Sequence, residues 1–313
     1  MNLLPELCNP FIVASCHFTG NERVLKSLNK FFVCWNHSNG FDPYPGALIL
    51  KSVSDRGGDG LQKPGVKRDI WHDDEYTFLR YSDGPKKLEL LKIDIACRLV
   101  ESARRIFPLK TKIGGSVLAG EKNSLKNIIK LQSAGVDFIE LNTKYLSRKY
   151  IDAEFYAKDK AEQSYDFFIG NIKNILNNAT IPVWIKFARD IIWLRNKEMS
   201  DFSNNLSRKD ISFVIANTQQ VYIHDNNKTK DGRAIIYGKN LFPITFDMIK
   251  HIRNIVNEEI PLIASGGVTT FKQTKALLEN GAEAIEYCVF FQDGNRDFST
   301  WKYYLSEEER YIC

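Results

Sequence analysis

The sequence lacks the cysteine and histidine spacings that would indicate a metal centre or a disulfide framework. No C-x-x-C pair occurs among the six cysteines, although such pairs are the usual sign of structural zinc. Cys16 has no histidine partner identifiable from the sequence, so we interpret it as an inert thiol. The histidines in predicted loops, His17, His37 and His72, are interpreted as ordinary polar residues. No metal site is therefore predicted.

Long apolar runs and one-signed charge clusters are also missing. No run approaches the roughly 18 apolar residues that suggest a membrane-spanning helix, and residues 1–7 lack the basic segment and apolar stretch of a signal peptide. We therefore expect a cytoplasmic protein. The 43 basic and 38 acidic residues give a net charge of +5, and the basic residues are scattered along the chain. This charge is too mild to predict nucleic acid as a partner.

The length and apolar content indicate one large core. The chain has 313 residues, 43% of them hydrophobic, and α/β barrels commonly form one domain at this length. We predict a single domain over residues 1–313, although two smaller domains also fit the length alone.

Strand-like and helix-like segments alternate along the chain. Several of the strand-like runs are short and continuously apolar, which is typical of a parallel sheet covered on both faces. They are residues 11–14, 47–51, 112–117, 137–141, 182–186, 211–216, 261–265 and 284–289. Residues 124–133, 245–256 and 270–279 have helical spacing of apolar residues. Eight such units predict a (β/α)8 TIM barrel, while a doubly wound open sheet fits the same alternation.

Polar residues stand at the carboxyl ends of four predicted strands. They are Lys51, Asn142, Lys186 and the pair Asn217-Thr218. In an α/β barrel these ends converge on one mouth, where active sites lie. We therefore predict that two lysines, two amides and a hydroxyl face a common ligand. Taken singly, the lysines could extend to solvent and the asparagines could close turns.

A paired glycine follows the seventh predicted strand. Gly266 and Gly267 end the run 261–265 and precede a helix that can begin at Thr270. Glycine lets backbone amides approach a phosphate closely, and a helix amino terminus favours an anion. The sequence predicts a phosphate site here, although such a pair alone is more often a tight turn.

Two long polar segments interrupt the alternation, residues 55–80 and residues 219–239. Both follow strands whose last residues are predicted to lie at the mouth. Long loops inside compact domains are usually lids, binding loops or insertions. We interpret them as loops at the carboxyl-terminal mouth of the barrel.

In order and spacing, the motifs resemble the FMN-dependent barrel family of dihydroorotate dehydrogenases, over about residues 8 to 294. The resemblance is carried by N-P-F-I-V-A-S at 9–15, G-A-L-I-L-K-S at 46–52, A-G-V-D-F-I-E-L-N at 134–142, P-V-W-I-K at 182–186, A-N-T at 216–218, P-L-I-A-S-G-G-V at 261–268 and N-G-A at 280–282. It implies a barrel with FMN bound across its mouth.

The resemblance also assigns residues to roles. The implied cofactor-binding residues are Ala14, Ser15, Lys51, Asn142, Lys186, Asn217, Gly238, Gly266, Gly267, Cys288 and Val289. The implied substrate-binding residues are Lys51, Asn142, Ser147, Asn217 and Thr218. Lys51 and Tyr145 are implied as catalytic, with Tyr145 at the position of the family's cysteine or serine base. A phenol is a poor base at neutral pH but a competent proton donor. The alternative is that Tyr145 packs under a loop, which is a common role of tyrosine.

Besides Tyr145, other positions depart from the family. Ser147 replaces a second asparagine, and Cys288-Val289 replaces the Gly-Thr pair that follows the eighth strand. Residues 75–85 contain no clear match to the loop that would hold orotate.

The expected activity is hydride transfer between flavin and a small dihydroorotate-like substrate, with dihydroorotate oxidation in pyrimidine biosynthesis as the reference reaction. One alternative is a catalytically silent relative that acts as a binding or scaffold module. Another is a flavin-free phosphate-binding isomerase or lyase. A homodimer is one possible oligomeric state.

Overall fold

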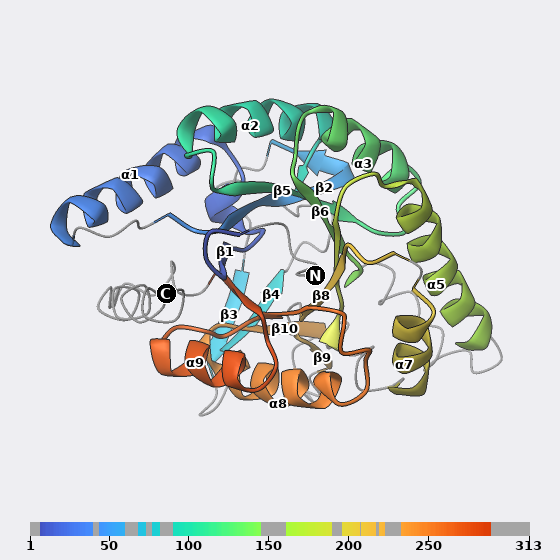
Figure 1. The fold of residues 1–313 in the computed structure, drawn as a ribbon. Coiled ribbons are helices and arrows are strands. Elements are labelled where there is room, and N and C mark those ends of the chain that lie inside the picture. The colour runs from blue at the N-terminus through green and yellow to red at the C-terminus, as the bar shows by residue number, and fades with distance from the viewer. Residues whose placement is uncertain are drawn as a thin grey trace.

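Eight parallel strands form a closed barrel surrounded by helices (Figure 1). The computed structural model describes residues 7–39, 44–59, 68–72, 77–81, 90–144, 161–189, 196–206, 208–216, 219–222 and 233–288. The barrel strands are β1 (Phe11–Val13), β2 (Ala47–Gly58), β5 (Lys112–Leu118), β6 (Phe138–Asn142), β7 (Val183–Lys186), β8 (Ile211–Ile215), β11 (Leu262–Ser265) and β12 (Ala284–Tyr287). Their order around the ring is β1-β12-β11-β8-β7-β6-β5-β2, which confirms the predicted (β/α)8 barrel.

Helices lie between most of the barrel strands along the chain. They are α1 (Glu22–Asn39), α2 (Ile93–Ile106), α3 (Ser124–Ser133), α5 (Ala161–Asn178), α7 (Asn196–Asn204), α8 (Phe242–Arg253) and α9 (Phe271–Glu279), with short 3-10 turns η1 (His17–Thr19) and η4 (Lys239–Leu241). The helix predicted at 124–133 is correct. The helix predicted at 245–256 begins earlier, at Phe242. Pro243 is accommodated in its first turn, because backbone N–H groups there have no partner within the helix.

Two apolar layers stabilise the barrel. One lies between strands and helices and includes Phe213 of β8. The other fills the amino-terminal half of the ring, where the rings of Phe138 and Trp184 stack with centroids 3.7 Å apart. The barrel is therefore closed below its mouth by packed side chains.

The two long segments predicted as loops contain strands that the sequence analysis missed. β2 extends to Gly58, and β3 (Arg68–His72) pairs with β4 (Thr77–Tyr81). From the other segment, β9 (Gln219–Tyr222) pairs with β10 (Arg233–Tyr237), and β10 pairs with β4. The result is an antiparallel four-stranded sheet, β3-β4-β10-β9, built from segments that lie far apart in the sequence.

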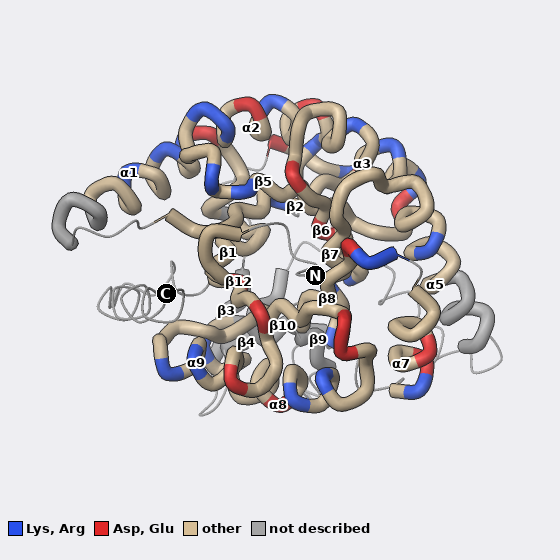
Figure 2. The backbone as a smooth tube through the Cα atoms, viewed as in Figure 1, with Lys and Arg blue, Asp and Glu red and all other residues tan. Residues whose placement is uncertain are grey.

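Basic and acidic residues are interspersed over the outer helices, as along α2 and α8 (Figure 2). Within the part of the chain that the structure describes, no helix combines the length and the apolar character needed to cross a membrane.

Candidate functional site

The carboxyl-terminal mouth of the barrel gathers several of the predicted site residues. Asn142, the last residue of β6, is in register with Lys186, the last residue of β7. The charges of both Lys51 and Lys186 act on the thiol of Cys16, which follows β1. Ala14 is fixed at the same end by its backbone N–H, which donates to the carbonyl oxygen of Tyr287 at 3.0 Å. Strands β1, β2, β6 and β7 therefore present their polar ends to one mouth.

Lys186 belongs to a buried charge cluster. Its Nζ atom lies 3.0 Å from Oε2 of Glu140 on β6 and 2.5 Å from Oε2 of Glu286 on β12. Glu140 is fully buried, and Glu286 and Lys186 are 2% and 6% exposed. Lys186 therefore does not extend to solvent, which rules out that alternative for this residue.

The cluster perturbs the pKa values of its members. Burial raises the pKa of Glu286 to about 8, with a further contribution from Glu140, although Lys186 opposes the shift. Burial alone would lower the pKa of Lys186, but attraction to Glu140 and Glu286 outweighs it and raises the pKa. The side chains of Glu140 and Glu286 also contact each other. A pKa of about 8 keeps a proton on Glu286 at neutral pH, which reduces the negative charge around the lysine cation.

A row of hydroxyl groups leads from the mouth into the barrel. The Oγ atom of Ser15 lies 3.2 Å from that of Ser52, which lies 2.8 Å from Oγ of Ser116. Ser52 lies within an irregularity in β2 between Leu50 and Val53. Ser15 was predicted as a site residue, whereas Ser52 and Ser116 were not.

Asn142 has both a structural and a binding capacity. Its side-chain Oδ1 accepts a hydrogen bond from the backbone N–H of Lys144 at 3.1 Å, so it closes the turn after β6. That contact agrees with the alternative interpretation of asparagine as a turn former. Its partly exposed position beside Lys186 also keeps it at the mouth.

The predicted phosphate loop is held open by its surroundings. Gly266 and Gly267 have φ angles of 118° and 80°, which other residues rarely adopt. A side chain at Gly267 would clash with the backbone of Phe242 at the start of α8. The glycines are thus needed by the fold itself. Among the described residues, no hydrogen bond uses the amide N–H of Gly266 or Gly267, so both remain available to an acceptor.

Arg189 supports this loop from below. Its guanidinium is fully buried and donates to the carbonyl oxygen of Ser265 at 2.9 Å and to Oγ1 of Thr245 at 2.7 Å. Thr245 in turn donates to the carbonyl oxygen of Gly266 at 2.7 Å. Arg189 follows the β7 motif by three residues and was not predicted as a site residue.

A capping box closes the start of α9. Oε1 of Gln273 accepts from the backbone N–H groups of Thr269 and Thr270 at 2.8 and 3.1 Å, and Thr270 caps the N–H of Gln273 at 3.3 Å. The anion capacity of the loop after β11 therefore rests on the glycine amides.

The thiol of Cys16 has a neighbour that was not predicted. It accepts a hydrogen bond from the thiol of Cys288, the residue after β12. The sequence separates the two by the whole barrel, and only ring closure between β1 and β12 brings them together.

Five predicted residues, Tyr145, Ser147, Asn217, Thr218 and Val289, lie outside the described residues. Gly238 lies after β10 with a φ angle of 94°, at the turn into η4. Glu140 and Glu286 were not predicted, although each is a charged residue inside an otherwise apolar strand, and that signal could have identified them.

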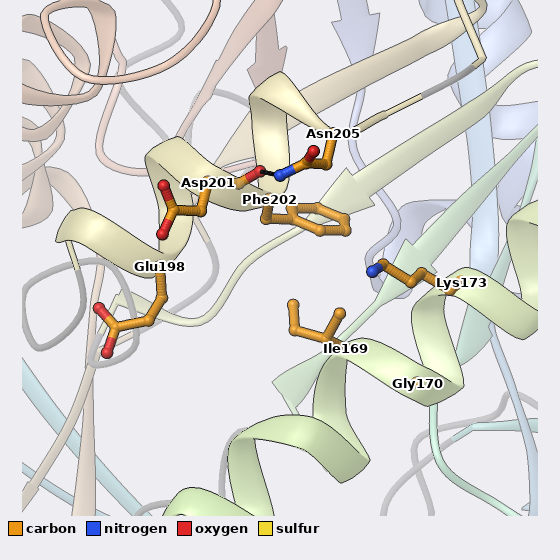
Figure 3. Close-up of a pocket in the computed structure, with 7 residues that line it drawn as sticks. All are labelled: Ile169, Gly170, Lys173, Glu198, Asp201, Phe202 and Asn205. Carbon is orange, nitrogen blue, oxygen red and sulfur yellow. Dashed lines mark hydrogen bonds between the residues drawn. The ribbon is translucent and has the colours of Figure 1, made fainter.

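A separate pocket of about 330 Å³ lies between α5 and α7 (Figure 3). It is lined by Ile169, Gly170, Lys173, Glu198, Asp201, Phe202 and Asn205. None of these residues was predicted for the site, and the pocket lies in the outer helical layer.

Comparison with known proteins gives two findings. A family model described as dihydroorotate dehydrogenase matches residues 107–297, which is more than half of the chain. Three curated relatives, from Coxiella burnetii strains Dugway 5J108-111, RSA 331 / Henzerling II and CbuK_Q154, are each named dihydroorotate dehydrogenase (quinone). Each is 23% identical over 108 residues, which cover 34% of this chain and 30% of the relative. Strands β1 and β2, with Ser15 and Lys51, lie outside the matched family region.

Proposed function

Because the chain belongs to the dihydroorotate dehydrogenase family, we propose that it is an FMN-dependent oxidoreductase acting on dihydroorotate or a related small dihydropyrimidine. We further propose that residues 1–313 act as one barrel domain. The observation that carries the proposal is the convergence of Lys51, Lys186 and Asn142 on the mouth of the barrel.

The groups at the mouth suit a flavin mononucleotide. The ring system of FMN presents both donors and acceptors at one edge. Lys51 and Asn142 supply donors there, and Oε1 of Glu140 and of Glu286 are buried acceptors without a hydrogen bond among the described residues. The amides of Gly266 and Gly267 suit a phosphate group. The resemblance implies that Cys288-Val289 replaces a Gly-Thr pair and so removes a hydroxyl, and backbone amides would carry that contact.

The roles of the residues follow from their charge and position. When bound, FMN would supply hydride acceptance at its N5 atom. Lys51 stabilises negative charge at the mouth and orients the substrate together with Asn142. The carboxyl groups of Glu140 and Glu286 offset the positive charge of Lys186.

We assign proton transfer to Tyr145, which follows β6 at the position of the family's base. Asn217, Thr218 and Ser147 are proposed to orient the substrate, and Val289 to lie beside the phosphate. Tyr145→Phe should then retain flavin binding and lose most of the rate of substrate-dependent flavin bleaching. Full retention of that rate would show that Tyr145 does not transfer the proton.

The test of the proposal is flavin binding followed by reduction. Purified protein, reconstituted with FMN if it is colourless, should show flavin absorbance. This absorbance should bleach when dihydroorotate is added without oxygen. Lys51→Met should weaken FMN binding at least about tenfold, or about 1.4 kcal/mol.

Lys112→Met is the matched control, because Lys112 begins β5 at the opposite end of the barrel. It should leave FMN affinity unchanged. Equal losses in both variants would contradict the role of Lys51. Failure to bind FMN would overturn the proposal, whereas binding without bleaching by any dihydropyrimidine would favour the silent binding module.

A further inference from the structure

The carboxyl ends of the first and last barrel strands each carry a cysteine. Val13 of β1 is in register with Tyr287 of β12, and the backbone N–H of Ala14 donates to the carbonyl oxygen of Tyr287 at 3.0 Å. Cys16 follows this contact by two residues, and Cys288 directly follows Tyr287. Their thiols lie within hydrogen-bonding distance of each other, and both residues are partly exposed.

Both backbones are fixed where the thiols meet. The Oγ1 atom of the buried Thr19 accepts from the N–H of Cys16 at 3.1 Å and lies 3.0 Å from its carbonyl oxygen. On the other strand, the hydroxyl of Tyr287 lies 2.6 Å from Oγ1 of Thr274 on α9. The thiols are therefore presented to each other by ordered segments, which lowers the entropic cost of joining them.

We propose that Cys16 and Cys288 form a dithiol site that is oxidised to an intramolecular disulfide by small-molecule disulfides. This inference goes beyond the proposed flavin chemistry and does not depend on it. Neither cysteine corresponds to the family's base position, which Tyr145 occupies.

The surroundings divide the roles of the two thiols. The hydrogen bond from Cys288 lowers the pKa of Cys16, and Lys51 and Lys186 lower it further, although burial opposes them. The same hydrogen bond, together with burial, raises the pKa of Cys288. Because the thiolate is the nucleophile in disulfide exchange, Cys16 attacks first and Cys288 resolves.

The exchange is balanced by the small disulfide alone. The Cys16 thiolate attacks one sulfur of the small disulfide, breaking its S–S bond and releasing one small thiolate, which takes up the proton lost by Cys16. Cys288, once deprotonated, attacks the Cys16 sulfur and releases the second small thiolate, which takes up the proton of Cys288. Two electrons thus pass from the two protein thiols to the small disulfide, which leaves as two thiols.

The test uses the full chain, incubated with oxidised glutathione, acid-quenched, alkylated and digested without reductant. Mass spectrometry should find the peptides of Cys16 and Cys288 joined, with two hydrogens lost, and dithiothreitol should separate them. Cys97→Ser, which alters another partly buried cysteine, should leave the joined peptides in place. Alkylation of both Cys16 and Cys288 after oxidation, with no joined peptides, would overturn the proposal.

Single variants test the order of attack. Cys288→Ser should accumulate glutathione on Cys16, because the resolving thiol is gone. Cys16→Ser should leave Cys288 largely unmodified over the same period, at least about tenfold slower. Glutathione on each cysteine in the unmodified chain, without a bond between them, would also overturn the dithiol site.

Discussion

The Nζ atom of Lys186 lies 2.5 Å from Oε2 of Glu286, inside a barrel where both side chains are almost fully buried. Removing charged groups from water is costly, and their attraction offsets that cost only when each group has partners. Glu140 provides the second partner of Lys186. The cluster is therefore coupled: a change of charge at one member changes the state of the others.

Glu286→Gln should remove a pH dependence of stability between about pH 4.5 and 8. Glu286 has a pKa of about 8 in the folded chain, against an ordinary value of 4.5. Between these values the folded protein holds a proton that the unfolded chain has released, so the free energy of unfolding falls as pH rises. The advantage of the unmodified chain over the variant should shrink by about 1 kcal/mol or more from pH 5 to pH 8. Urea unfolding at several pH values measures it.

Glu279→Gln is the control for that experiment, because Glu279 is exposed on α9. Its effect on the pH dependence of unfolding should be much smaller than that of Glu286→Gln. A difference between Glu286→Gln and the unmodified chain that stays constant over this range would contradict the assigned pKa.

Lys186→Met should destabilise the barrel by about 3–5 kcal/mol, because it leaves two buried carboxyl groups without their cation. Adding Glu140→Gln and Glu286→Gln to the same chain should restore most of the loss, since neutral amides need no counter-ion. The free energy of unfolding of the single and triple variants in urea distinguishes these outcomes. A triple variant no more stable than the single one would show that the loss comes from packing.

Gly114→Ala should destabilise the fold by about 1–3 kcal/mol through overpacking. A methyl group there would clash with the ring of Phe138, which stacks on Trp184 inside the barrel. Gly170→Ala is the matched control, because it lies in α5 with open space around its added methyl group. That change should stabilise the chain by up to about 1 kcal/mol. Thermal unfolding of both variants compares them, and similar losses would contradict the crowding at Gly114.

Arg189→Met should cost about 2–4 kcal/mol of stability, because the carbonyl of Ser265 and the hydroxyl of Thr245 lose a charged donor. It should also weaken FMN binding, since Ser265 and Thr245 position Gly266. Arg104→Met is the control: its ion pair with Asp137 is partly exposed and should contribute at most about 1 kcal/mol. Unfolding in urea and titration with FMN measure the two effects. Unchanged FMN affinity would show that Arg189 does not position the glycine loop for FMN binding.

The barrel was predictable because its strands are locally recognisable. Runs such as Pro182 to Lys186 and Pro261 to Ser265 are continuously apolar and end in polar residues or glycine, which are signals contained within a few positions. The four-stranded sheet was not predictable in this way. It depends on the pairing of β4 with β10, in which Phe78 lies opposite Ile236. Local sequence patterns do not reveal pairing between segments so far apart in the chain.

The site was predictable only as far as strand ends reveal it. Lys51, Asn142 and Lys186 were predicted from position alone, and the register of β6 and β7 places the last two side by side. The state of Lys186 was not predictable, because its partner Glu286 comes from a strand 100 positions away. The Cys16–Cys288 contact has the same origin.

Closure of the barrel joins β1 to β12, so residues near position 12, which pair with β2 on one side, find their second partners only near position 286. During synthesis, β1 must wait for nearly the whole barrel to leave the ribosome before its free edge toward β12 can be covered. An exposed strand edge promotes pairing with other chains. The interval before β12 emerges is therefore the period when the nascent chain is most exposed to aggregation. Slowing translation just upstream of residue 284 should lengthen this interval.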